Sequence, residues 1–386
     1  MSFFKPVFLF AAGVAALVAV TLALLLAGGY PAQSALLALW NGSMGSWYSL
    51  TSATLVRAVP LMLTGCAVAV AFRAGVFNIG AEGQLLAGAA AATAVALALP
   101  HGGFVALILA MLAGTAAGGA WAGLAAFLRA RFGVLEVIST IMLNFVAVHA
   151  VSYLVRGPLQ EPTHVYPQTS TIADGVHLAR LPGAGRLHAG LLIALAILIV
   201  CGWVFRHTAA GFRLLAAGES PAAANSAGMI DVGRTTRLAF LWSGALAGLA
   251  GAVEVLGVTF ALYENISPGY GYTAIAVALL AGLDPWHIVL SATLFAGLEA
   301  GAGAMQRDAS VPSALVSVIE ALLILVVIAS QTLRWRGHRT PSILAAAAVE
   351  LPGGPTSSRP FWRPRYERQL RWRSPRSASS SSSGQG

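Results

Sequence analysis

Charge is the scarcest property of this 386-residue sequence, because only 10% of its residues are Asp, Glu, Lys or Arg. Soluble globular domains carry about 25% charged residues, so the chain is not an ordinary soluble domain. Lysine is nearly absent, and Lys5 is the only one. The G-x-x-x-x-G-K-[ST] loop of P-loop ATPases requires a lysine. The chain therefore cannot bind ATP through a P-loop of its own.

Cysteine and the residue patterns of catalytic sites are also lacking. Cys66 and Cys201 both fall within apolar runs and form no CxxC pair, which argues against a disulfide framework or a cysteine metal site. The eight histidines show no HExxH spacing, and no G-x-S-x-G motif occurs. No two carboxylates lie close together within one apolar run. The sequence thus predicts no catalytic residue, no metal ligand and no cofactor, and it argues against an enzyme.

Long apolar runs dominate the chain instead. Hydrophobic residues make up 57% of it and the mean hydropathy is +0.76, which indicates a polytopic membrane protein. A helix needs about 20 apolar residues to cross a bilayer, although the eighth run below is short for a full crossing. The expected fold is all-α, with about ten transmembrane helices at 7–26, 51–72, 81–99, 103–128, 135–155, 189–205, 238–258, 273–283, 286–306 and 312–333.

The net charge of +9 belongs mainly to the C-terminal region. Ten arginines and two glutamates between Arg334 and Arg376 give +8, which leaves +1 for the rest and no basic face for nucleic acid. Residues 1–336 form the expected transmembrane permease domain. Residues 337–386 form an Arg-, Pro- and Ser-rich tail that is expected to be disordered in the cytoplasm. Its arginines could contact anionic membrane lipid, or the tail could simply be solvated.

Loop arginines set the expected orientation through the positive-inside rule. With the N-terminus in the cytoplasm, the outer loops at 29–50, 99–102 and 259–272 carry no Lys or Arg. The exceptions are Arg307 and the long 156–188 loop, which has three arginines and is expected to form an extracytoplasmic cap. Ten spans then place both termini in the cytoplasm. They also divide into two halves of five, and five is odd, so a repeated second half would be inverted.

The stretch Arg73–Gln84 carries most of the functional information. It interrupts two apolar runs with three glycines, two amides and a carboxylate. Polar or non-helical backbone survives at membrane depth only inside protein or beside a wet cavity, and an ionisable residue there indicates a functional site by default. One interpretation is a broken helix on a translocation path, and the other is a short cytoplasmic turn. The residues expected to form the broken helix are Asn78, Gly80, Glu82, Gly83 and Gln84.

A second interrupted segment, Ser267–Thr273, lies between the seventh and eighth expected spans. Its place in the second half corresponds to that of Arg73–Gln84 in the first half. Paired Gly- or Pro-interrupted segments at corresponding positions indicate a transport path. Gly269 and Gly271 are therefore expected to belong to the same site. The repeat is inferred from this pattern alone, because the two halves show no residue-level identity.

A short cytoplasmic helix is predicted between the sixth and seventh spans. Ser220 suits the N-cap, Pro221 the first helical position and Gly228 the C-terminal stop. A short helix with both ends capped is typical of one that docks into a groove of another protein. The alternative is a connector that packs on its own bundle. The residues expected to form this coupling segment are Gly218, Glu219, Ser220, Pro221, Ala224 and Gly228.

Four ordered stretches resemble the permease subunits of bacterial ABC importers in the branched-chain amino acid, ribose and nucleoside group. They begin at Gly75, Ala217, Ser243 and Gly269. The form Asn-Ile-Gly-Ala-Glu-Gly-Gln at 78–84 looks most like the nucleoside branch, which depends on basic membrane lipoproteins. The resemblance implies a multi-pass permease of the bacterial cytoplasmic (inner) membrane. It also implies ATP-binding cassette subunits, a second homologous permease subunit and an extracytoplasmic substrate-binding lipoprotein as partners, with 218–228 docking on the ATPase.

The expected function is ATP-driven inward transport of a small polar solute, a nucleoside or a related purine or pyrimidine compound. ATP hydrolysis is expected on separate subunits, because this chain has no P-loop. An ABC permease for sugars or branched-chain amino acids is an alternative. Another is a secondary transporter driven by an ion gradient, with Glu82 as an ion or proton ligand, because such proteins share inverted halves and broken helices. An intramembrane enzyme lacks the residue patterns it would need.

Overall fold

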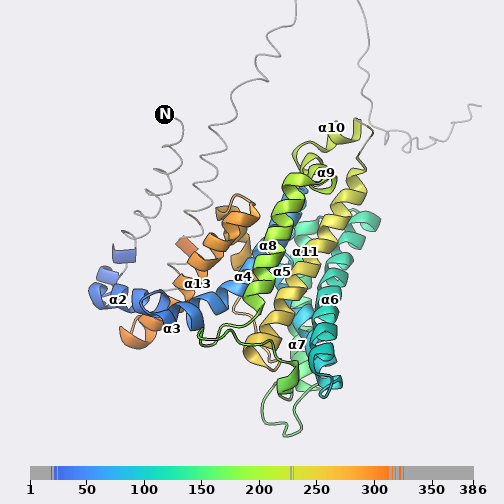
Figure 1. Ribbon diagram of the computed structural model, residues 1–386. Coiled ribbons are helices and arrows are strands. Elements are labelled where there is room, and N and C mark those ends of the chain that lie inside the picture. Colours follow the sequence, from blue (N-terminus) through green and yellow to red (C-terminus); the bar gives the residue numbers. More distant parts are fainter. Residues whose placement is uncertain are drawn as a thin grey trace, which may run out of the picture. The chain divides into compact units, whose positions relative to one another are not determined.

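The computed structural model of the protein describes residues 25–226, 228 and 230–312, together with residues 19, 21–23, 315, 318, 321–322 and 325. Within these residues the chain is helical, with two isolated β-bridges and no strand (Figure 1). The all-α prediction is therefore confirmed. The expected first span at 7–26, the last span at 312–333 and the tail at 337–386 lie largely or wholly outside the described residues.

Seven helices of the described part are long and apolar enough to cross a membrane, and each matches a predicted span. The eighth expected span is α12 (Tyr270–Leu280), an apolar helix of 11 residues that is too short to cross. The seven are α4 (Leu55–Arg73), preceded by α3 (Trp47–Ser49) and η1 (Leu50–Thr54), then α5 (Ala81–Ala98), α6 (Gly103–Phe132), α7 (Glu136–Arg156), α8 (Gly190–His207), α11 (Val232–Glu254), which continues as η3 (Val255–Thr259), and α13 (Pro285–Asp308).

The count of ten spans in two inverted halves stays a prediction. Its first and last members fall outside the described residues. The segment expected to be an outer loop at 29–50 contains a helix that the sequence analysis did not predict, α2 (Ala32–Ser43). Its 12 residues are too few for a span, so the search for long apolar runs overlooked it. It packs closely on α13, where Gly42 lies against Ala304 and Gly301 lies against Leu39.

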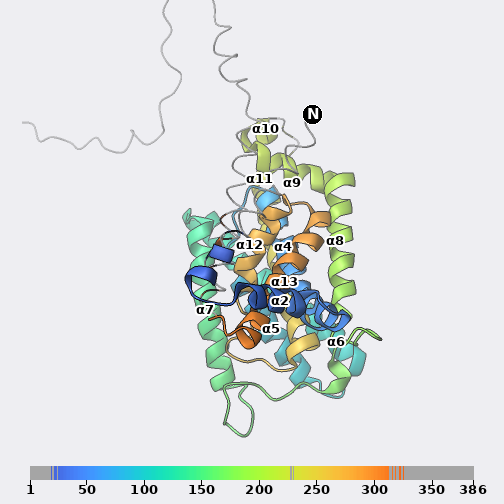
Figure 2. The ribbon, with the colours of Figure 1, turned by 90° about the vertical axis from the view of Figure 1, so that its left-hand side faces the viewer.

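Helix α11 forms the centre of the bundle, in contact with α4, α5 and α6 (Figures 1 and 2). Small residues allow this close approach, as is usual for helices in membranes. Gly118 of α6 lies against the backbone of Gly244 and Gly248, and Gly88 of α5 also lies against Gly248. A methyl group at any of these positions would strike a neighbouring backbone, so the bundle depends on glycine at its centre.

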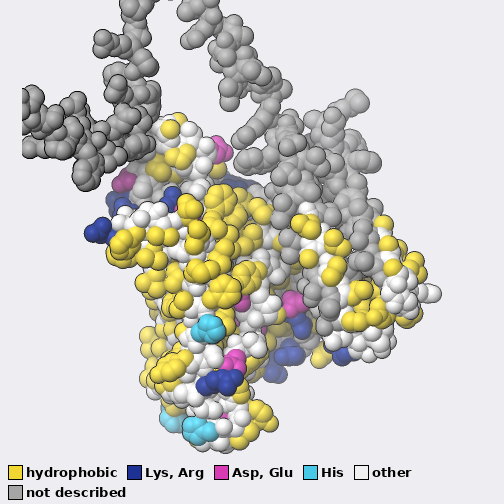
Figure 3. Space-filling model, turned by 180° about the vertical axis from the view of Figure 1, so that it is seen from behind, with side chains coloured by type: hydrophobic (Ala, Val, Ile, Leu, Met, Phe, Trp, Pro, Cys, Tyr) yellow, Lys and Arg dark blue, Asp and Glu magenta, His cyan; other side chains and the backbone are white. Residues whose placement is uncertain are grey.

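The bundle has two distinct ends (Figure 1). One end, named here the α9–α10 end, carries α9 (Ala209–Glu219) and α10 (Pro221–Ser226). The other, the loop end, carries residues 157–189, including η2 (Asp174–Val176). Figure 3 shows a face on which hydrophobic side chains form a broad band, with charged and histidine side chains mainly above and below it. This distribution is that expected of a multi-pass membrane protein.

The 157–189 segment covers the loop end, as the sequence predicted for a cap. Its backbone N–H groups at Thr169, Ile172 and Leu178 donate hydrogen bonds of 2.8–2.9 Å to carbonyl oxygens between Leu256 and Leu262. The side chains of Ile172 and Val176, which belong to the segment, are buried. The segment is therefore held against the end of η3 and the non-helical residues that follow.

Candidate translocation path and coupling segment

The first helix break consists of residues 74–80, between α4 and α5. Gly75 adopts the left-handed conformation (φ +73°) that commonly ends a helix, and the N–H groups of Gly75 and Val76 bond back to Phe72 and Ala71. Helix α5 has 18 residues, whereas α6 has 30. At 1.5 Å per residue α5 is about 18 Å shorter than α6. Glu82, Gly83 and Gln84, which were expected in the break, lie in the first turn of α5 instead. A broken helix on a translocation path stays a prediction.

A fully buried amide pair holds the first break in shape. Asn78 donates from Nδ2 to Oε1 of Gln84 at 2.9 Å and accepts at Oδ1 from Nε2 of Gln84 at 3.0 Å. Nδ2 of Asn78 also donates to the Ser243 hydroxyl on α11 at 2.9 Å, and Oδ1 accepts from the Gly80 N–H. These bonds replace those a continuous helix would supply, because buried backbone and amide groups need partners. Gly80 leaves space for the pair, since a Cβ there would lie 3.0 Å from Gln84 Nε2.

The second helix break consists of residues 260–269, between η3 and α12. It begins at Phe260, in the left-handed conformation (φ +57°), and ends at Gly269 (φ +103°). The Ser267 hydroxyl accepts hydrogen bonds from the N–H groups of Gly269 and Tyr270, which caps the start of α12. In both breaks a non-helical segment leads into the N-terminus of a helix.

The two breaks meet at a junction formed by Glu82 and Gly271. Oε2 of Glu82, a side chain that is only 5% exposed, accepts a hydrogen bond of 2.7 Å from the Gly271 N–H. The backbones at these residues touch, and a Cβ on Gly271 would overlap the Glu82 backbone. The N-termini of α5 and α12 thus face each other, each with free N–H groups and a partial positive charge. The Glu82 carboxyl group stabilises both and joins the two interrupted segments, and their assignment to one transport path stays a prediction.

The sequence analysis missed Asn144, a buried residue of α7 that braces the same junction. Its Oδ1 accepts from the Gly83 N–H at 2.9 Å, and its Nδ2 donates to the Ile79 carbonyl at 2.9 Å and to the Tyr272 hydroxyl at 3.3 Å. A lone amide within the apolar run 135–155 was the available sign. Its partners lie 61 to 128 residues away in the sequence, so the sequence could not show what it binds.

The coupling segment packs against the start of the first break. Gly218, near the end of α9, lies so close to the Arg73 carbonyl and to Gly75 that a Cβ would overlap the backbone. The following helix, α10, starts at Pro221 as predicted, and Ser220 caps it through a 3.4 Å bond from the Ala223 N–H. Gly228 is left-handed (φ +67°), as expected of a stop. Glu219 and residues 220–223 are exposed while Ala224 is buried.

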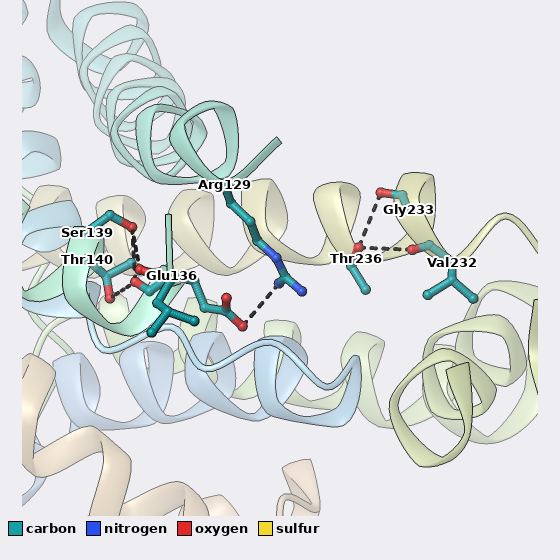
Figure 4. Close-up of polar contacts among 8 residues, drawn as sticks. Arg129, Glu136, Ser139, Thr140, Val232, Gly233 and Thr236 are labelled. Atoms are coloured by element: carbon teal, nitrogen blue, oxygen red, sulfur yellow. Dashed lines mark hydrogen bonds and ion pairs between the residues drawn. The ribbon is translucent and has the colours of Figure 1, made fainter. Parts of the chain in front are cut away.

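A cavity of about 430 Å³ lies beside this segment. Figure 4 shows polar contacts near it, where Arg129 at the end of α6 forms a 3.1 Å ion pair with Glu136 at the start of α7. The Thr236 hydroxyl of α11 donates to the Val232 and Gly233 carbonyls. The cavity is lined by Gly75 of the first break, by Ala217 and Pro221 of the coupling segment, and by Arg129, Thr236 and Arg237, among others. The coupling segment, the first break and α11 therefore border one space.

The structure does not place Asn78, Glu82 or Gln84 on the wall of this cavity. All three are buried and hydrogen-bonded to other parts of the protein. Among the described residues, no group of three or more His, Cys, Asp or Glu side chains could hold a metal ion. The arrangement holds the two helix breaks together.

Comparison with known proteins assigns the chain to a family. Residues 50–328 match the family described as the permease component of branched-chain amino acid transport systems. The chain belongs to this family. The permease is 38% identical to the guanosine ABC transporter permease protein NupP of Bacillus subtilis over 316 aligned residues. These residues make up 81% of this chain and 90% of NupP.

Two further relatives are named for the solutes that they transport. The glucose ABC transporter permease protein TsgB13 of Haloferax volcanii is 40% identical over 300 residues, covering 75% of the permease and 78% of TsgB13. The nucleoside ABC transporter permease protein NupB of Lactococcus lactis is 32% identical over 325 residues, covering 82% and 88%. The expected resemblance to ABC permeases is thus confirmed. These relatives are transport subunits, which argues against an enzyme and does not favour a secondary transporter.

Proposed function

We propose that the permease is one membrane subunit of an ATP-driven importer that moves a nucleoside, or a related purine or pyrimidine compound, inward across the bacterial cytoplasmic membrane. The likeness to the guanosine permease NupP, along 90% of that protein's length, carries the proposal. The likeness to NupB, which is named for nucleosides, supports the same cargo.

The importer requires further subunits. ATP hydrolysis takes place on separate ATP-binding cassette subunits, and an extracytoplasmic lipoprotein delivers the solute. A second homologous permease completes the membrane part. Support for two different permeases comes from Bacillus subtilis, where NupP and NupQ are both guanosine ABC transporter permease proteins and both resemble this chain.

The α9–α10 end faces the cytoplasm in this proposal, as do both termini. Arg129 and Arg237 line a cavity at that end, and Arg73 lies against Gly218 of α9. Their position agrees with the positive-inside rule. The 157–189 segment then lies on the extracytoplasmic side, where the binding lipoprotein would dock.

The coupling segment passes motion of the ATPase subunits to the helix breaks. Closure of those subunits on ATP displaces α10 and α9. Gly218 touches the backbone of Arg73 and Gly75 with no side chain between them, so the displacement reaches the first break directly. The Glu82–Gly271 bond then carries it to α12. Tightly packed elements of this kind move as rigid bodies between discrete arrangements.

Asn78, Glu82 and Gln84 hold the breaks in this mechanism. Each is hydrogen-bonded to protein at or beside the junction. A cargo contact would require these satisfied bonds to open, which costs about 1–3 kcal/mol for each buried group left without a partner. We therefore place the cargo elsewhere on the path.

Uptake into proteoliposomes that hold the complete importer tests the proposal. Radiolabelled guanosine is expected to accumulate when ATP is supplied to the ATPase subunits and to be unaffected by ionophores. Accumulation that follows an imposed ion gradient without ATP would contradict the proposal. A sugar is the second candidate cargo, because TsgB13 is a glucose permease by name. Glucose uptake without guanosine uptake would show that the cargo is a sugar and not a nucleoside.

A further inference from the structure

A second polar cavity, of about 440 Å³, lies at the loop end of the bundle and is named here the Glu254 cavity. Its volume falls in the range of small-molecule sites, roughly 300–1,000 Å³. Its walls come from η1 and the start of α4, the end of α11 with η3, the second break, α13 and the 157–189 segment. The lining residues that bear on ligand chemistry are Arg57, Arg186, Glu254, Tyr263, Asn265 and Glu299.

Glu254 is the most informative of these residues. The last residue of α11, it is only 5% exposed and yet lines the cavity. Within the part of the chain that the structure describes, its carboxyl group has no hydrogen bond and no ion pair. A carboxyl group buried in this way is costly unless something binds it. An ionisable side chain at membrane depth also indicates a functional site.

The charges around the cavity favour a neutral ligand. Arg57 forms a 3.8 Å ion pair with Glu299 and donates to the Ala53 carbonyl at 3.1 Å. Arg57 and Arg186 line the same cavity as Glu254, and among the described residues neither forms an ion pair with it. The formal charges of two arginines and two glutamates cancel, so a strongly charged ligand would leave the site unbalanced. Tyr263, which is 37% exposed, offers an aromatic ring and Asn265 an amide.

We infer that the Glu254 cavity binds the neutral cargo during transport and that the carboxyl oxygens of Glu254 accept hydrogen bonds from two adjacent hydroxyl groups of a sugar ring. A carboxyl group offers two oxygens side by side, which suits a pair of neighbouring hydroxyl donors. Ribose in a nucleoside and the ring of a free hexose share this chemistry. The inference rests on the proposed function and adds a place and a recognition residue to it.

The cavity is directly connected to the helix breaks. Pro268 and Tyr270 belong to its wall, and the next residue, Gly271, donates its N–H to Glu82. A solute in the cavity therefore touches the segment that sets the junction of the two breaks. Motion that starts at the coupling segment and passes through the junction would reach this wall and change the shape of the cavity.

The experiment compares two solutes in proteoliposomes that contain the complete importer with its binding lipoprotein. ATP-dependent initial rates are measured for guanosine and for 2′,3′-dideoxyguanosine, which lacks both ring hydroxyls. The permease variants are wild type, Glu254→Gln, Glu254→Asp and Asp308→Asn, the last being an exposed carboxylate outside the cavity. For each variant, the guanosine rate is divided by the dideoxyguanosine rate. Every preparation contains the same lipoprotein, so its preference affects all these ratios equally and a difference between variants comes from the permease.

The ratio is expected to fall about tenfold or more in Glu254→Gln, because one of its two acceptor oxygens becomes a donor. Glu254→Asp, which keeps both oxygens, should retain most of the preference, and Asp308→Asn should match the wild type. An unchanged ratio in Glu254→Gln overturns the inference. If neither Glu254 variant assembles, Glu254 is a folding residue and the inference is also overturned.

A sugar arm separates this inference from the proposed function. Glucose and 2-deoxyglucose are measured in the same vesicles, and a glucose preference that Glu254→Gln abolishes would keep the site but change the cargo. A wild-type importer that moves neither guanosine nor glucose with ATP rejects the proposed cargo, and the inference falls with it. Wild-type guanosine uptake together with an unchanged ratio in Glu254→Gln rejects the inference alone.

Discussion

The junction of the helix breaks and the Glu254 cavity are both polar and both lie within an apolar bundle, yet their hydrogen bonding differs. At the junction, the side chains of Asn78, Glu82 and Gln84 all have protein partners. In the cavity, Glu254 is equally buried but has no hydrogen-bond partner among the described residues. The comparison teaches that burial of a polar side chain does not by itself reveal its role. The satisfied groups of the junction hold structure, whereas the Glu254 carboxyl group lines a cavity of ligand size.

The largest effect is expected at Gly218, which links the coupling segment to the junction. Gly218→Trp should abolish uptake while the subunit still inserts, because an indole cannot fit between α9 and the Arg73 carbonyl. Uptake and the amount of permease in the membrane fraction are the measurements. Gly175→Trp is the matched control, since Gly175 is exposed at the loop end and the nearest atom to its Cβ position is 3.7 Å away. Wild-type uptake in Gly218→Trp would show that the junction is not driven through this contact.

Glu219→Arg separates docking from packing at the same place. Glu219 is exposed, so its replacement should leave the fold intact and act only on the surface that meets the ATPase. Uptake is expected to be lost with no change in melting temperature. Normal uptake in this variant would remove Glu219 from the docking surface and leave Gly218 with a packing role alone.

Asn78→Ala tests whether the junction is structural, as its satisfied bonds indicate. The change leaves Gln84, Ser243 and the Gly80 N–H without a partner. We expect a loss of about 3 kcal/mol of stability, visible as a lower melting temperature of the purified subunit. Glu254→Gln should leave the melting temperature nearly unchanged, because no hydrogen bond or ion pair of Glu254 occurs within the described part of the chain. Equal loss of stability in both variants would break the distinction between junction and cavity.

Gly271→Ala tests the close approach of α5 and α12. The added methyl group would overlap the Glu82 backbone, and such overpacking costs about 1–3 kcal/mol. Thermal unfolding of the purified subunit measures the effect. Gly175→Ala is a suitable control, because the nearest atom to its Cβ position is 3.7 Å away. A melting temperature equal to that of the control would mean that the two helix N-termini can separate freely.

The smallest effect is expected for Glu82→Gln. An amide oxygen can still accept the Gly271 N–H, but a charge-assisted bond becomes a neutral one, with a loss of about 1 kcal/mol. Uptake should be impaired without unfolding of the subunit, because the two helix N-termini lose their negative partner. Uptake equal to wild type would limit Glu82 to a static structural role.

Local patterns were sufficient for much of the fold. Seven spans agree with their apolar runs because membrane helices must satisfy their own backbone, which leaves a signature of length and hydropathy. The cap and stop of α10 at Ser220, Pro221 and Gly228 were predictable because capping depends on neighbouring residues. Helix α2 was missed because its 12 residues owe their position to packing on α13.

The sequence by itself determined the membrane class and the family, because each depends on composition or on short ordered motifs. It located the two interruptions only approximately, since the structure puts the breaks at residues 74–80 and 260–269, with Glu82 in α5 and Gly271 in α12. Only the tertiary structure decided that the breaks face each other, that Gly218 lies on Arg73 and Gly75, and that Asn144 braces the junction. It also decided that Glu82 has a hydrogen-bond partner and that Glu254 has none among the residues that the structure describes. The physical reason is that these contacts join residues 61 to 189 positions apart. Whether a buried polar group is satisfied depends on such distant partners, and no local pattern records them.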